Sequence, residues 1–132
     1  MKFVEQRSDD DCLRAALASV LDLAYEDVPE NVRAGDEQHN RMQAFLSGRG
    51  LVAWTFGLHG VTDPQLMFGH EKIPYHLHPT GYWLASVGSP RNEDDHGVVM
   101  RGSHIVWDPH PQRGLAHRGF TQAIILMPWE AV

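Results

Sequence analysis

The spacing of apolar residues changes along the chain, from a helical pattern near the start to strand-like runs later. From Leu13 to Ala24, apolar side chains recur at intervals of three and four residues, which is the spacing of one helix face. The acidic run Asp9 to Asp11 comes directly before this stretch and supplies candidate N-caps. We therefore expect a first helix that begins near Cys12.

A loop and a second helix follow. The segment 24–36 is acidic and is interrupted by Pro29 and Gly35, which predicts a loop with at most a short helical turn. Residues 36–47 carry three apolar side chains on one helical face, namely Met42, Phe45 and Leu46. Two glycines stop this pattern, so we expect the second helix to end at about residue 47.

The rest of the chain is dominated by runs of β-branched and aromatic residues. These runs cover residues 51–56, 82–87, 97–100, 104–107 and 120–127. Helices followed by strands indicate an α+β fold, with N-terminal helices packed on a C-terminal antiparallel sheet. Residues 57–81 contain three prolines and no clear period, so we expect a long surface excursion that lines a cleft.

Size and charge restrict the function classes. The chain has 132 residues, 42% of them hydrophobic, which is enough for one domain with its own core, and we assign residues 1–132 to it. The formal net charge is -6, and the basic residues are scattered rather than gathered in a patch. A nucleic-acid partner is therefore not expected.

The sequence also bears on location. No apolar run approaches the length of a membrane span, and acidic residues stand where a secretory signal would have its apolar region. The single cysteine cannot form an internal disulfide, which is typical of a reducing compartment. We expect a cytoplasmic protein without a membrane partner.

Cys12, the only cysteine, lies where the first helix is predicted to begin. The free amides and partial positive charge of a helix N-terminus favour a thiolate, the nucleophilic form of cysteine. The aspartates before it act in the opposite direction unless they face solvent or cap the helix. A reactive thiol at this position therefore requires a nearby cation, for which histidine is the usual residue.

A predicted hairpin offers such a histidine. His96 and Asp108 are equally far from Gly102, so a turn centred on this glycine would place them directly opposite each other. Opposed residues in an antiparallel pair have Cβ atoms about 4.5–5.5 Å apart, which allows a carboxylate to orient an imidazole. A register shift of one residue would separate them onto opposite faces. We also single out Gln6, whose amide is placed to join the Cys12 backbone N–H as a donor to an oxyanion.

These motifs resemble those of a known enzyme family. Gln6, Asp11-Cys12 and the following alanines are similar to the N-terminal motif of bacteriocin-processing, double-glycine-leader peptidases, and His96-Gly97 followed by Asp108 resembles their His and Asp motifs. The resemblance covers residues 4–21 and 94–110 and implies the papain-like cysteine peptidase fold. It also implies a Cys-His-Asp triad and a glutamine in the oxyanion hole. Residues 21–30 and 108–111 also resemble segments of small stand-alone bacterial and phage proteins.

Three functions are consistent with these residues. The first is a cofactor-free cysteine hydrolase or acyl transferase that acts on a peptide, amide or isopeptide bond of a peptide or protein substrate. The second is a papain-like domain that binds a partner without catalysis. The third is a metal-binding protein, suggested by the nine histidines of the chain and in particular by His70, His76, His78 and His110.

Overall fold

The computed structural model describes residues 1–61, 81–92, 94–102 and 104–131. The helical elements are α1 (Cys12–Val20), the short 3-10 helix η1 (Tyr25–Asp27), α2 (Gln38–Ser47) and a final 3-10 turn, η3 (Trp129–Ala131). The strands are β1 (Leu51–Val61), β2 (Tyr82–Gly88), β3 (Asp95–Arg101), β4 (His104–Trp107) and β5 (Phe120–Pro128).

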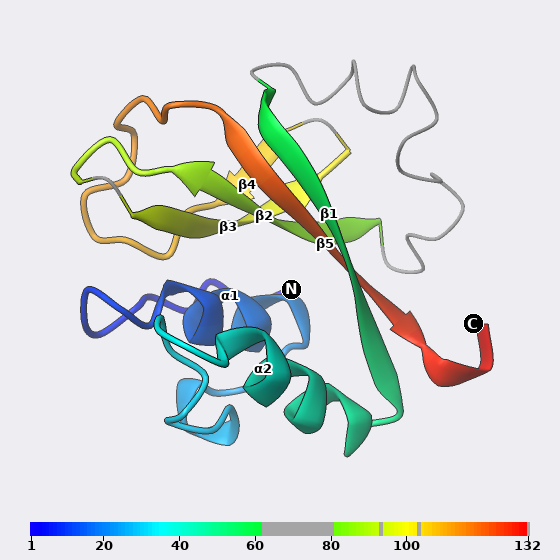
Figure 1. The fold of residues 1–132 in the computed structure, drawn as a ribbon. Helices are drawn as coiled ribbons and strands as arrows, with labels where there is room; N and C mark the ends of the chain where they lie inside the picture. Colours follow the sequence, from blue (N-terminus) through cyan, green and yellow to red (C-terminus); the bar gives the residue numbers. More distant parts are fainter. Residues whose placement is uncertain (62–80, 93, 103, 132) are drawn as a thin grey trace.

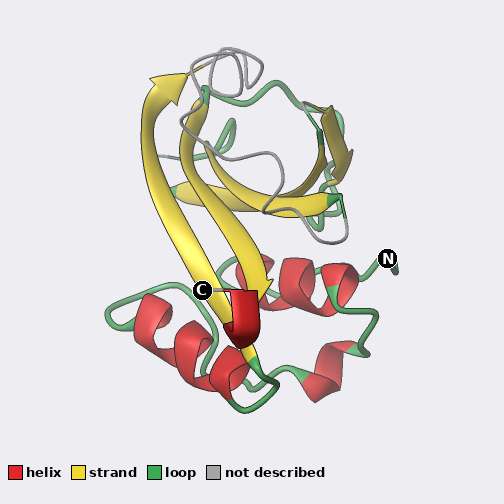
Figure 2. Ribbon diagram, turned by 90° about the vertical axis from the view of Figure 1, so that its right-hand side faces the viewer, coloured by secondary structure: helices red, strands yellow, loops and turns green. Residues whose placement is uncertain are grey.

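These elements form the α+β arrangement that the sequence predicts. The strands make one antiparallel sheet in the order β1-β5-β2-β3-β4. Figure 1 shows α1 and α2 together on one side of this sheet, and Figure 2 shows how strongly the sheet twists and curls. Helix α1 packs on β3 and β2, and α2 packs on β1.

Both faces of the central strands β2, β3 and β5 are buried, and successive side chains of each strand point to opposite sides. On β2, Leu84 joins the core beneath the helices, whereas its neighbours Trp83 and Ala85 join a second core on the other face. On β3, Val99 faces the helices and Val98 faces away from them. This alternation places consecutive residues of β3 in different environments, which matters for the site described below.

The first helix is shorter than its apolar spacing suggests. It ends at Val20 because Asp22 adopts a left-handed conformation, with φ of 56°. The Leu23 N–H then donates to the Ala18 carbonyl at 2.8 Å, and the Asp22 N–H donates to that of Ser19 at 3.4 Å, so the chain turns out of the helix. Apolar side chains after the turn still pack against the core, which explains why the pattern continues past the helix end.

The prediction of a surface excursion over residues 57–81 is wrong for its first residues, 57–61. Strand β1 extends to Val61, because an irregularity after Gly57 allows pairing with β5 to resume at Val61 opposite Phe120. Residues 62–80 lie outside the described part of the chain. Among the helices that the structure describes, none has the length and apolar character needed to cross a bilayer.

The register of the β3–β4 hairpin also differs from the prediction. Met100 pairs with Ile105 instead of His104, a shift of one residue that would place Asp108 on the face opposite His96. An irregularity then inserts one further residue into β4, so that Val99 pairs with Trp107. The two one-residue shifts cancel in their effect on side-chain direction, so Asp108 returns to the face of the sheet that carries His96. Asp108 therefore lies next to His96, although the predicted pairing of the two strands was wrong.

Candidate active site

The sulfur of Cys12 lies where the first turn of α1 meets β3. Its Sγ accepts a hydrogen bond from the backbone N–H of Gly97 at 3.3 Å, and it lies close enough to His96 to raise the pKa of that imidazole. Cys12 is the first residue of α1 and is only 9% exposed. The thiol therefore meets a backbone donor and an imidazole, both of which stabilise a negative charge on sulfur.

Gly97 allows this close approach of strand and helix. A Cβ atom at this position would lie 3.6 Å from the Leu13 nitrogen and 3.7 Å from the Cys12 sulfur. These are ordinary van der Waals distances, so there is room for a methyl group and little more. A larger side chain at Gly97 would separate β3 from α1 and break the hydrogen bond to sulfur.

His96 and Asp108 form a short, largely buried pair. The distance from Nε2 of His96 to Oδ1 of Asp108 is 2.6 Å, and His96 is 5% exposed. Burial disfavours the charged imidazole, but hydrogen bonds with Asp108 and Cys12 and the negative charges of both raise the pKa of His96 to about 9. His96 is therefore protonated at neutral pH while it is held between the carboxylate and the thiol.

The same pair affects the carboxylate. Burial raises the pKa of Asp108, but hydrogen bonds from His96 and from the His110 backbone N–H, together with the charges of His96 and Arg91, lower it overall. Because Nε2 of His96 is engaged by Asp108, Nδ1 is the ring nitrogen left for the thiol. The three side chains predicted as a triad therefore lie together, with His96 hydrogen-bonded to Asp108 and electrostatically coupled to Cys12.

Gln6 lies in the loop before α1 and is 6% exposed. Its side-chain Nε2 donates to the Ser8 carbonyl at 2.8 Å, which uses one of its two hydrogens, and its Oε1 is buried without a hydrogen-bond partner among the described residues. Its backbone N–H donates to the Pro109 carbonyl at 3.0 Å. This last bond ties Gln6 to the residue that follows Asp108.

The aspartates before Cys12 have separate environments. Asp9 is exposed, and Asp10 is half-exposed with its carboxylate 4.0 Å from Arg33. Asp11 is fully buried at the N-cap position but makes no side-chain cap bond to α1. Its carboxylate instead accepts hydrogen bonds from the backbone N–H groups of Arg7 and Ser8 and from the Tyr25 hydroxyl.

These contacts explain how a charged carboxylate is kept buried beside Cys12. Burial raises the pKa of Asp11, but the hydrogen bonds from Tyr25, Arg7 and Ser8 lower it overall, so its charge is stabilised by neutral donors. Asp11 holds the same loop whose Ser8 carbonyl receives the Gln6 amide. The residue therefore anchors Gln6, and the first amides of α1 are left uncapped by its side chain.

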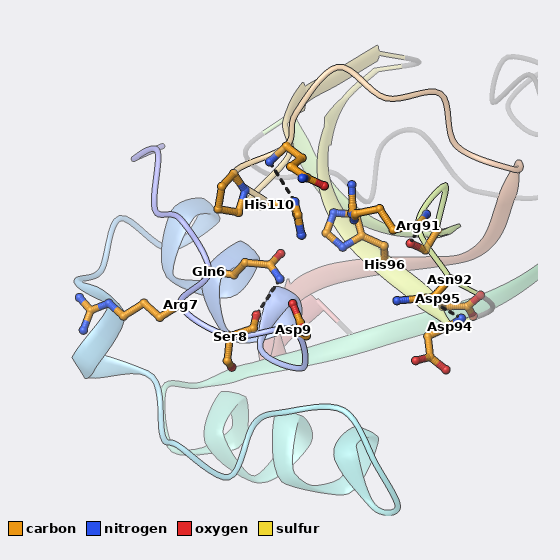
Figure 3. A pocket seen from close by; sticks show the side chains of 13 residues that line it. Gln6, Arg7, Ser8, Asp9, Arg91, Asn92, Asp94, Asp95, His96 and His110 are labelled. Atoms are coloured by element: carbon orange, nitrogen blue, oxygen red, sulfur yellow. Dashed lines mark hydrogen bonds between the residues drawn. The ribbon is translucent and has the colours of Figure 1, made fainter.

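A pocket of about 550 Å³ adjoins these residues. One wall is the loop from Gln6 to Asp9, and the other is formed by segments around Arg91, His96 and His110. Figure 3 shows the Gln6 side chain directed into the space between these walls. A substrate bound here would contact both His96 and Gln6.

Several residues of this region were missed or assigned another role from the sequence. The backbone N–H of Gly97 as a donor to sulfur had no sequence signal beyond the glycine itself, and Arg91 had none. His110 was considered only as a metal ligand. The structure describes no group of three or more His, Cys, Asp or Glu side chains arranged to hold a metal ion, and His70, His76 and His78 lie outside its described residues.

Comparisons with protein-family models, with curated proteins and with solved structures gave no significant match to this chain.

Proposed function

We propose that the protein is a papain-like cysteine hydrolase or acyl transferase that acts on an amide, isopeptide or peptide carbonyl. The observation that carries the proposal is the grouping of Cys12, His96 and Asp108: the sulfur accepts a hydrogen bond from the N–H of Gly97, the residue after His96, and His96 is hydrogen-bonded to Asp108 at 2.6 Å and coupled to the charge of Cys12. A thiol, an imidazole and a carboxylate in this order are the arrangement that nucleophilic acyl transfer requires.

In the proposed reaction, the Cys12 thiolate forms a bond to the substrate carbonyl carbon, and the carbonyl oxygen becomes an oxyanion. His96 then gives its proton to the leaving nitrogen as the carbon–nitrogen bond breaks. Water or an acceptor amine attacks the resulting thioester, with neutral His96 accepting its proton, and Cys12 leaves as thiolate. Asp108 orients the ring and stabilises its charged form throughout.

The oxyanion requires donors in addition to the triad. The backbone N–H of Cys12 belongs to the first turn of α1, where amides have no intrahelical partner. Gln6 has one Nε2 hydrogen that is not used by Ser8. These two groups support an oxyanion hole, whose individual donors contribute about 10²- to 10³-fold to turnover.

The second candidate is a papain-like domain that binds a partner without catalysis. The low exposure of Cys12, 9%, favours it, and Cys12 is not among the residues that line the pocket. The two functions differ in the reactivity of the thiol. A recessed but activated thiol reacts with a small electrophile at pH 6, whereas an inert buried thiol does not.

The test is the rate of Cys12 alkylation by iodoacetamide at pH 6, measured by intact mass in His96→Gln and in the matched control His104→Gln. His104 is an exposed histidine of the same hairpin. We expect a loss of roughly 100-fold for His96→Gln and no change for the control. Equal rates in all three proteins, at the level of an ordinary thiol, would reject the enzyme in favour of the binding domain.

A substrate screen completes the test. Peptide, isopeptide and thioester libraries would be incubated with wild type and Cys12→Ala, and turnover and acyl-enzyme mass would be recorded. With any substrate found, the double variant His96→Ala/Asp108→Asn should be hardly slower than His96→Ala, because residues that act as one unit are not additive. Losses that multiply would place Asp108 outside the catalytic unit.

A further inference from the structure

The guanidinium of Arg91 is a cationic group of the pocket that has no role in the reaction proposed above. Arg91 comes from the turn between β2 and β3, and its Nη1 is buried without a hydrogen-bond partner among the described residues. Arg91 lines the pocket together with His96 and His110, and its positive charge lowers the pKa of both Asp108 and His110. A buried donor that lacks an acceptor is unfavourable unless a ligand supplies one.

His110 supplies a second donor to the same pocket. Its Nδ1 accepts a hydrogen bond from the Gln112 backbone N–H at 2.9 Å, so the neutral ring carries its hydrogen on Nε2. Burial lowers the pKa of His110, and the positive charges of Arg91 and His96 lower it further, whereas Asp108 and Asp9 act in the opposite direction. Neutral His110 therefore presents an Nε2–H to the pocket that it lines.

The two donors lie near the proposed reaction centre. The ring centroids of His110 and His96 are 6.1 Å apart, and the His110 backbone N–H donates to Asp108 at 2.9 Å. Figure 3 shows His96, His110 and Arg91 at the same side of the pocket that all three line. A ligand group that accepts from both donors would sit next to the carbonyl attacked by Cys12.

Carboxylates line other parts of the pocket and limit the charge of any ligand that binds Arg91 and His110. Asp9 stands on the Gln6 wall, and Asp94 and Asp95 follow the β2–β3 turn, where Asp95 accepts a hydrogen bond from the Thr121 hydroxyl at 3.0 Å. These groups would repel a multiply charged anion. They favour a ligand with a single negative charge at the Arg91 side.

We propose that Arg91 and His110 form a subsite for one carboxylate of the substrate, adjacent to the carbonyl that Cys12 attacks. This inference rests on the proposed function and adds a substrate class to it. A planar carboxylate matches the fork of a guanidinium and accepts a third hydrogen bond from an imidazole N–H. The carboxylate is either the C-terminus of a peptide or an acidic side chain, and both present the same chemistry.

Charged and neutral electrophiles test the subsite. The probes are bromoacetyl-Gly with a free carboxylate, bromoacetyl-Asp amide, and their neutral counterparts bromoacetyl-Gly amide and bromoacetyl-Asn amide. In each, the Cys12 sulfur displaces bromide and forms a thioether, and the product is read by intact mass because Cys12 is the only cysteine. The measured quantity is the rate ratio of each carboxylate probe to its neutral counterpart at low salt.

We expect a ratio of about 10- to 100-fold in wild type for at least one carboxylate probe, the range of a charge-assisted hydrogen bond. Arg91→Met should remove most of this preference and Arg91→Lys should retain part of it. The matched control Arg49→Met, which removes an equal charge at the end of α2, should leave the ratio unchanged. His110→Phe should lower it and His110→Gln, which keeps a donor, should preserve it.

The outcomes separate the subsite from the chemistry. A preference for bromoacetyl-Gly alone identifies a C-terminal carboxylate, and one for bromoacetyl-Asp amide alone identifies an acidic side chain. If wild type shows the same rate ratios as Arg91→Met, and that variant is folded, the subsite is rejected. This holds even if the neutral probes react rapidly with Cys12. Slow reaction with all neutral probes would reject the proposed function, while the ratio would still report on Arg91 and His110.

Discussion

Replacing Asp108 with asparagine tests how the proposed ion pair is maintained. Asparagine keeps the size of the side chain and one acceptor oxygen, but removes the negative charge that lies 2.6 Å from His96 Nε2. The backbone hydrogen bond from His110 also loses a charged acceptor. The variant therefore removes an electrostatic interaction with little change of shape.

The expected magnitude follows from the pKa of His96. Its rise from 6.5 to about 9 corresponds to roughly 3 kcal/mol in favour of the charged imidazole. This is a net value, because burial acts against the charge and the interactions with Asp108 and Cys12 exceed that penalty. Two unit charges about 4 Å apart interact by about 4 kcal/mol at an effective dielectric constant of about 20. Because asparagine keeps a hydrogen-bond acceptor, we expect the loss of interaction energy to be smaller than this value. The pKa of His96 should then fall by about 2.

The assay is the pH dependence of Cys12 alkylation by iodoacetamide between about pH 4 and pH 10. In wild type, protonated His96 sustains the thiolate, so the rate should already be on a plateau below pH 7. In Asp108→Asn, the equilibrium constant between the ion pair and the neutral thiol–imidazole pair should fall by about 100-fold, so the rate at pH 6 should fall by up to the same factor. The control Asp36→Asn removes an equal charge from an exposed loop and should match wild type.

Two results would refute this reasoning. A plateau retained in Asp108→Asn, with a rate within about threefold of wild type at pH 6, would mean that Asp108 does not maintain the charge of His96. A wild-type rate that rises only as an ordinary thiol titrates, at about pH 8.5, would mean that the free protein has no reactive ion pair.

Three further predictions concern neighbouring residues. Gln6→Ala should keep the wild-type alkylation rate and lose about 10²- to 10³-fold in turnover, because its amide acts on the oxyanion and hardly on the thiolate; equal losses in both assays would remove Gln6 from the oxyanion hole. The stability difference between wild type and His96→Gln, from urea unfolding, should be fully present below about pH 6.5 and disappear as pH rises through about 9, since a raised pKa stabilises the fold only while the group is protonated. A difference that grows with pH would contradict the raised pKa. Tyr25→Phe should lower the free energy of unfolding by about 1.5–3 kcal/mol, the range for a hydrogen bond to a charged group, because buried Asp11 loses a donor. No measurable change in the urea midpoint would show that Asp11 does not depend on this hydroxyl.

Local elements and the residue types of the site could be predicted from sequence patterns alone. The three- and four-residue spacing after Leu13 depends on near neighbours, which is why the start of α1 at Cys12 was predictable. Its end was not, because Asp22 turned the chain while the apolar spacing continued. The β3–β4 hairpin followed from the strand runs on either side of Gly102, but its register did not.

The packing of whole elements determined which of these residues meet. The extra residue in β4 restored the face of Asp108, and no periodicity in the sequence marks that insertion. The hydrogen bond from Gly97 to the Cys12 sulfur joins residues 85 positions apart, and it exists because β3 lies against the first turn of α1. Such contacts depend on how distant elements fit together, whereas sequence patterns report the preferences of short segments.

The same distinction explains Arg91 and His110. Neither stands in a local pattern that predicts binding, and the sequence offered His110 only as a candidate metal ligand. The fold sets both beside His96, and the Gln112 N–H fixes which nitrogen of His110 carries the hydrogen. Sequence supplied the donors, and packing determined that they face one pocket, because direction and burial arise only when distant segments are brought together.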